Sequence, residues 1–172
     1  MRSRVRFLVS TSVFSVFALA LTYIEALIPI GGAIPIPGFK LGLSNVVSAY
    51  VITFDPFAAF LIMLLKVAIS ALLFGSPVSF IFSLAGGTLS FGFMLILSHV
   101  LGDKLSYFGI SSTGGFFHNL GQLAVTSVLY GVNVALAYST PMLLSGILCG
   151  GVLGVILNLI SVRVDNLVKK MY

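Results

Sequence analysis

The sequence predicts an all-α integral membrane protein, a bundle of six transmembrane helices that forms one domain over residues 1–172. Three observations favour this fold class. Of the residues, 59% are hydrophobic and only 8% are charged, whereas about a quarter of a soluble domain is charged. The mean hydropathy is +1.18. Uncharged apolar runs recur along the chain at lengths near the ~20 residues that cross a hydrocarbon core. Together these features exclude a soluble enzyme domain, a disordered chain and a disulfide-stapled module.

Six segments are expected to span the bilayer, and they cover residues 7–28, 41–54, 56–74, 77–101, 115–137 and 141–162. Asp55-Pro56, Ser76-Pro77 and Thr140-Pro141 each place a capping oxygen just before a proline, which predicts helix starts at these three points. The segment 41–54 is short for a span, so it either begins earlier or is a partly re-entrant helix.

Basic residues predict the orientation of the bundle. With six spans, both termini lie on one side of the membrane. That side carries seven basic residues: Arg2, Arg4, Arg6, Lys104, Arg163, Lys169 and Lys170. The other side carries one, Lys40. The positive-inside rule therefore predicts that both termini lie in the cytoplasm. We expect the membrane to be the cytoplasmic (inner) membrane. The loop PIGGAIPIPGFK (residues 29–40), rich in proline and glycine, then faces outward.

The chemistry that the sequence lacks is also informative. There is no G-x-x-x-x-G-K-[ST] motif for ATP, and the four acidic residues are scattered, so no cluster is expected to hold Mg²⁺ against a diphosphate. Cys149 has no partner for a disulfide, and two histidines are too few to predict a metal site. We therefore expect no cofactor, no metal and no catalytic residues. We also expect no nucleic-acid partner, because membrane orientation accounts for the net charge of +5.

Four polar residues are candidates for binding a substrate. Lys66 lies halfway along the third predicted span, where an ammonium costs ~2.5–3.5 kcal/mol on insertion scales. Glu25 lies near the outer end of the first span. The two either pair with each other and fix the packing, or line a substrate cavity. Lys40 and Asn45, at the outer start of the second span, form a cationic lip for an anionic ligand, unless Lys40 only snorkels to the interface.

The fifth predicted span opens with GGFFHNLGQL, which places His118, Asn119 and Gln122 on one helical face with Gly115. Such a polar seam either lines a cavity or forms interhelical hydrogen bonds. On the expected bounds it starts from the inner side of the bilayer. Small residues form two further stripes, Gly146, Gly150 and Gly154 on the sixth span and Ser15, Ala18, Thr22 and Ala26 on the first. Each stripe either packs within the bundle or docks another membrane subunit.

The runs KLGLSN, LFGSPVSFIFSLAGGTLS and GGFFHNLGQL resemble one family over about residues 23–161. It is the family of Gx transporters, also labelled heptaprenyl diphosphate synthase component I. In size and layout the chain is similar to the substrate-binding S components of energy-coupling factor (ECF) vitamin importers. This resemblance implies a six-helix protein that captures a small molecule from outside and docks on a transmembrane T subunit with two cytoplasmic ATPases. It also implies that the loop at 29–40 is a lid, and that Ser15, Ala18, Thr22 and Ala26 are the docking stripe, although the stripe lacks the Ala-x-x-x-Ala form.

Two other functions remain open at this stage. Taken literally, the synthase label implies a noncatalytic membrane component associated with isoprenoid synthesis, since a prenyl synthase itself needs clustered aspartates that this chain lacks. A secondary transporter working without ATPases is the third class, for which Glu25, Lys66 and His118 would supply the ion relay. The sequence does not specify the substrate, the oligomeric state or whether an ECF module is the true partner.

Overall fold

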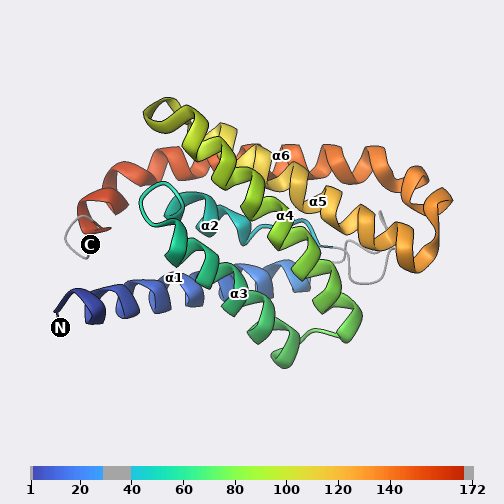
Figure 1. Cartoon of the computed structure of the whole chain (residues 1–172), viewed down its shortest axis with the longest axis horizontal. Coiled ribbons are helices and arrows are strands. Elements are labelled where there is room, and N and C mark those ends of the chain that lie inside the picture. Colours follow the sequence, from blue (N-terminus) through green and yellow to red (C-terminus); the bar gives the residue numbers. More distant parts are fainter. Residues whose placement is uncertain (1, 29–39, 169–172) are drawn as a thin grey trace.

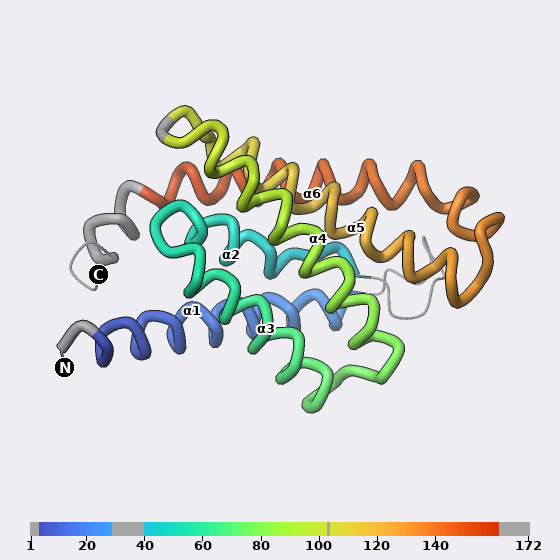
Figure 2. Tube along the Cα trace, in the orientation of Figure 1, coloured from blue at the N-terminus to red at the C-terminus, as the bar shows by residue number. Residues whose placement is uncertain are grey.

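The computed structural model describes residues 2–28 and 40–168, with the side chains of residues 2, 3, 103 and 162–168 left aside. The described residues form helices without strands. The helices are α1 (Arg2–Leu27), α2 (Asn45–Val51), α3 (Pro56–Leu73), α4 (Pro77–Leu101), the short 3₁₀ turn η2 (Gly102–Lys104), α5 (Tyr107–Tyr130) and α6 (Val132–Val168). Successive helices run in alternating directions, so the start of α1 and the end of α6 lie at one end of the bundle (Figures 1 and 2).

Four of the helices in the described ranges are long and apolar enough to cross a membrane: Arg4–Leu27, Pro56–Leu73, Pro77–Leu101 and Val132–Ser161. The expected capping interactions are present at two starts. Asp55 accepts a hydrogen bond from the backbone N–H of Ala58, and Ser76 accepts one from Ser79. These bonds satisfy N–H groups that a helix start otherwise leaves free. The described residues are therefore helical and include four helices fit to cross a membrane, and α3 and α4 begin where the Asp-Pro and Ser-Pro pairs predict.

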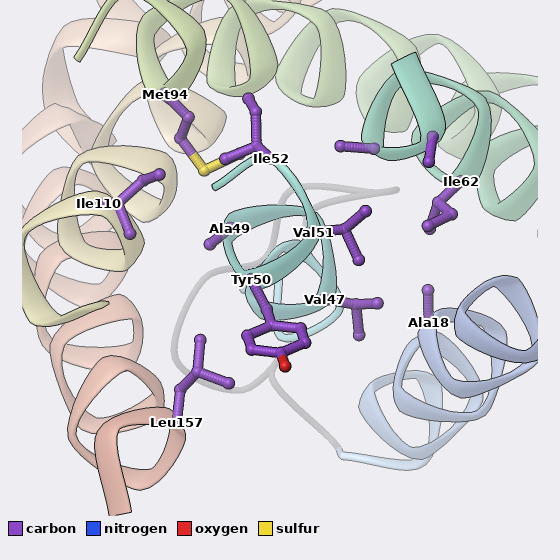
Figure 3. Close-up of a cluster of buried hydrophobic side chains, with 12 residues drawn as sticks. Ala18, Val47, Ala49, Tyr50, Val51, Ile52, Ile62, Met94, Ile110 and Leu157 are labelled. Atoms are coloured by element: carbon purple, nitrogen blue, oxygen red, sulfur yellow. The ribbon is translucent and has the colours of Figure 1, made fainter. Parts of the chain in front are cut away.

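The second predicted span is not a full span. Helix α2 has only seven residues, and six of them are buried inside the protein. Figure 3 shows side chains from the other helices pointing at it from all around. The resulting core joins one or more residues of every helix: Ala18, Val47, Ala49, Tyr50, Val51, Ile52, Ile62, Met94, Ile110 and Leu157. Apart from Asn45 and Ser48 this helix is apolar, so its sequence resembles that of a short span.

The predicted bounds of the last two spans are wrong. Helix α5 starts at Tyr107, capped by Ser106, so most of the expected connector at 102–114 is helical. The break between α5 and α6 is Gly131, with φ of +96°, a backbone conformation that only glycine adopts at little cost. The expected start at Thr140-Pro141 lies inside α6. Proline removes one helical hydrogen bond and its ring crowds the carbonyl four residues earlier; helix α6 nevertheless continues past Pro141 and packs closely on α5 through the glycines that follow it.

Helices α5 and α6 approach each other through glycines. A Cβ atom added to Gly115 would collide with the backbone carbonyl of Gly146, and one added to Gly154 would lie 2.6 Å from the Cα atom of Phe108. Gly150 likewise faces the carbonyl of Ser111. The glycine stripe of α6 thus packs within the chain, as small residues commonly do between membrane helices.

We expect Gly115→Ala to destabilise the protein by about 1–3 kcal/mol, because the new methyl group must push α6 away from α5. The free energy of unfolding in mixed detergent micelles measures this change. The matched control is Gly92→Ala on α4, where a Cβ meets nothing within 4 Å. That variant should be neutral or slightly stabilising, since alanine favours helix by roughly 0.5–1 kcal/mol over glycine. Equal stability of the two variants would contradict the close approach of α5 and α6.

Candidate functional site

Residues 40–45, called here the clamped segment, lead into α2 and are held by side chains from three long helices. Gln122 of α5 bonds both ways to the backbone of Lys40: its Oε1 accepts from the N–H at 3.0 Å, and its Nε2 donates to the carbonyl at 2.9 Å. Glu25 of α1 accepts from the N–H of Gly42 at 2.7 Å and from that of Leu43 at 3.1 Å. These bonds satisfy backbone groups that no helix pairs.

Lys66 of α3 provides the third hold on the clamped segment. Its Nζ donates to the hydroxyl of Ser44 at 2.8 Å and to the amide oxygen of Asn45 at 2.7 Å. Both Lys66 and Glu25 are buried, at 4% and 3% exposed. The interpretation of a direct Lys66–Glu25 ion pair is wrong: each charge bonds to the clamped segment, which lies between them. An ammonium has three donors, so Lys66 keeps one N–H beyond these two bonds.

His118 of α5 lies beside the clamped segment because two glycines make room for its ring. A Cβ at Gly42 would lie 2.8 Å from Cδ2 of His118, and one at Gly86 would lie 2.7 Å from Nδ1. Gly42 also has φ of +81°, which favours glycine on its own account. The Nε2 atom of His118 is buried without a hydrogen-bond partner among the described residues. The Nε2 atom of His118 is therefore free to bond to another polar group at this site.

A small polar cavity of about 10 Å³ lies where these groups meet. Its lining includes Thr22, Glu25, Lys40, Lys66, Ser83 and His118. The hydroxyl of Ser83 is buried and, like His118, has no hydrogen-bond partner within the described ranges. A cavity of this size holds about one water molecule. Hydrogen-bonding side chains from several helices therefore surround a space too small for a larger ligand.

Burial lowers the pKa of the Lys40 ammonium at the rim of the cavity, and the nearby Glu25 carboxylate opposes that shift. Desolvation disfavours the charged form, while an opposite charge favours it. The environment of Lys40 thus combines two opposing effects on its pKa. The side chain of Lys40 is half-buried here.

The four predicted substrate-binding residues, Glu25, Lys40, Asn45 and Lys66, come together at this site. Of the polar seam, His118 and Gln122 join them. Because α5 begins eight residues before the expected start, both lie in the middle of the helix and not at its inner beginning. Asn119 faces away, where its Nδ2 donates to the Met142 carbonyl and the Ser145 hydroxyl of α6. The seam therefore divides into a cavity side and a packing side.

The small-residue stripe of α1 packs inside the chain. Ser15, Ala18 and Thr22 are buried, and only Ala26 is exposed. Another subunit would not reach the three buried residues in this conformation. Of the expected lid at 29–40, only Lys40 lies within the described residues.

Sequence reasoning missed two members of the site. Ser44 is the hydroxyl partner of Lys66, and Ser83 lines the cavity from α4. The motif KLGLSN, which places Ser44 next to Asn45, was the available signal for the first. Nothing in the sequence distinguishes Ser83 from the other serines of α4.

A family model described as heptaprenyl diphosphate synthase component I matches residues 14–160. The chain belongs to this family. The resemblance seen in the sequence is therefore confirmed, and the family description denotes one component of a synthase. No curated protein and no solved structure gives a significant match.

We expect Gln122→Met to free the start of the clamped segment while keeping a side chain of similar length. Two hydrogen bonds worth about 1 kcal/mol each are lost, so amide hydrogen exchange at residues 40–43 should accelerate roughly tenfold or more. Exchange measured by mass spectrometry on peptides covering these residues tests this. The control is Thr126→Val, one turn further along α5, whose hydroxyl bonds only within its own helix. Unchanged exchange in Gln122→Met would show that Gln122 does not hold the segment.

Proposed function

We propose that this chain is the membrane substrate-binding component of an ECF-type importer, and that it captures a small anionic organic molecule from outside. The observation that carries the proposal is the convergence of buried polar groups on one cavity. Glu25, Lys66 and His118 come from α1, α3 and α5, and they meet the clamped segment with Lys40 and Asn45. Buried charges are costly among apolar helices and commonly mark a functional site.

The charges of the site favour an anionic ligand. Lys40 and Lys66 supply two positive charges and Glu25 one negative charge, so one positive charge is in excess. Both carboxylate oxygens of Glu25 accept hydrogen bonds from the backbone, which leaves Glu25 less free to repel an anion. The remaining N–H of Lys66, the ring of His118 and the hydroxyl of Ser83 are then available for ligand oxygens.

Binding requires the clamped segment to move. Ligand pockets are typically about 300–1,000 Å³, whereas the cavity is about 10 Å³. The bonds from Glu25, Gln122 and Lys66 to the segment are the contacts that a ligand would replace or loosen. In this proposal the described arrangement is the closed, ligand-free form.

The proposed partners are a transmembrane T subunit, two cytoplasmic ATPases and the surrounding bilayer. The chain has no P-loop motif, so hydrolysis would come from the partners. The helix ends that carry Arg4 and Arg6 are proposed to face the cytoplasm, which places both termini inside and the polar cavity toward the outer side of the inner membrane. In this role the chain is not an enzyme.

The family description favours a second candidate, a noncatalytic membrane component that associates with a soluble heptaprenyl diphosphate synthase. It predicts a different partner and no captured ligand. Uptake by the chain alone, in vesicles without ATPases, would point to a secondary transporter instead.

We expect native mass spectrometry of the protein, purified gently from its own membranes, to show a bound small molecule that is lost in Lys66→Met. Losing a hydrogen bond to a charged group costs about 1.5–3 kcal/mol, which weakens binding roughly tenfold to a hundredfold. The control is Lys104→Met, the same change at an exposed lysine in η2, just after α4. It should keep the ligand.

The outcomes separate the candidates. A ligand retained in a folded Lys66→Met variant, with only the melting temperature lowered, would make Lys66 structural. A wild-type protein that carries no ligand and co-purifies with a soluble prenyl synthase, without ATPases, would overturn the importer proposal.

A further inference from the structure

The five long helices form an incomplete ring around α2. Around the ring, α1 packs against α3, α3 against α4, α4 against α5 and α5 against α6. Helix α2 contacts all five. Within the described residues α1 and α6 make no contact with each other, so the ring is open along one seam, and α2 forms the floor of that seam. The wide spacing between α1 and α6 is visible in Figure 1.

This seam contains an apolar groove of about 330 Å³. Phe14, Phe17 and Leu21 of α1 form one wall, Ile156 and Ile160 of α6 belong to the other, and Val46 lies on the floor. The groove is too apolar to hold ordered water, which needs two to four polar partners. An apolar cavity of about 150 Å³ can hold a benzene molecule, so this groove is large enough for a chain of roughly a dozen carbon atoms.

The groove and the polar cavity are neighbours on two elements. On α1, Leu21 lines the groove and Thr22 lines the cavity. Where the clamped segment enters α2, Ser44 lines the cavity and Val46, in the first turn of α2, lines the groove. Consecutive positions on a helix point about 100° apart, so the two spaces lie on adjacent faces of α1. A molecule with a polar end and an apolar end fits such a pair.

We propose that the ligand is a single-chain amphiphile, whose anionic head lies in the polar cavity and whose hydrocarbon chain lies in the seam groove. This inference rests on the proposed function and names its substrate class. The head replaces contacts of the clamped segment around Lys66 and His118. The chain fills the gap between α1 and α6 and contacts Val46 and Tyr50 on the floor.

The test uses three probes titrated into the purified wild-type protein and followed by native mass spectrometry. Farnesyl phosphate has both head and chain, dimethylallyl phosphate has the head with a single isoprene unit, and farnesol has the chain alone. Farnesyl phosphate should bind at least tenfold more tightly than either of the others. Dodecyl phosphate, with a straight chain, then distinguishes an isoprenoid source from a fatty one.

Substitutions in the groove make the test specific. Ile156→Trp fills the groove and should weaken farnesyl phosphate at least tenfold without changing the affinity for dimethylallyl phosphate. The control is Val155→Trp on the same helix, which is 49% exposed against 47% for Ile156 and lies outside the groove. Ile160→Trp is a second blocking variant, should the first fail to fold. Circular dichroism and the melting temperature report folding.

The failures are distinguishable. Equal affinity for the two prenyl phosphates, with no effect of either groove variant, would overturn the amphiphile while the importer proposal stands. Equal affinity for farnesyl phosphate and farnesol, unaffected by Lys66→Met, would make the groove an ordinary lipid site and also overturn it. If neither phosphate binds, the amphiphile is wrong, and the native ligand of the wild-type protein still decides the proposed function.

Discussion

The structure depends on how the backbone of residues 40–45 is satisfied. An irregular segment among apolar helices must find hydrogen-bond partners within the protein. Glu25 and Gln122 provide these backbone partners from α1 and α5, and Lys66 of α3 holds the side chains of Ser44 and Asn45. By holding one segment together they fix the positions of α1, α3 and α5 and place α2 at the centre of the bundle. The short helix α2 can occupy the centre of the bundle because the segment that leads into it is held by these hydrogen bonds.

The same contacts explain why two opposite charges are buried without touching. A direct ion pair would compensate the charges of Glu25 and Lys66, but it would leave the amides of Gly42 and Leu43 unpaired. Charge-assisted hydrogen bonds to the backbone and to neutral side chains are stronger than neutral ones. Burying the charges against the clamped segment therefore satisfies more polar groups than pairing them would. It also makes the site sensitive to a ligand that competes for the same bonds.

Much of this architecture follows from local chemistry, and the rest follows from tertiary contacts that local chemistry does not report. Asp55 and Ser76 cap helices because their oxygens act within one turn. Thr140-Pro141 has the same pattern but lies inside α6, where glycine packing against α5 outweighs the proline. The cost of a buried charge identified Glu25 and Lys66 as site residues. The partners of Glu25 are backbone amides brought close by the fold, and no residue pattern marks a bare amide as a partner. Lys66 instead bonds to the side chains of Ser44 and Asn45.

The position of α2 couples the two spaces of the molecule. Its approach, residues 40–45, closes the polar cavity, and Val46 and Tyr50 on the helix itself form the floor of the seam groove. Residues 40–45 run directly into this seven-residue helix. Releasing residues 40–43 from Glu25 and Gln122 would therefore shift the floor of the seam as well as open the cavity. A ligand that occupies both spaces would contact the clamped segment with its head and α2 with its chain. Binding of the head and of the chain would then be cooperative.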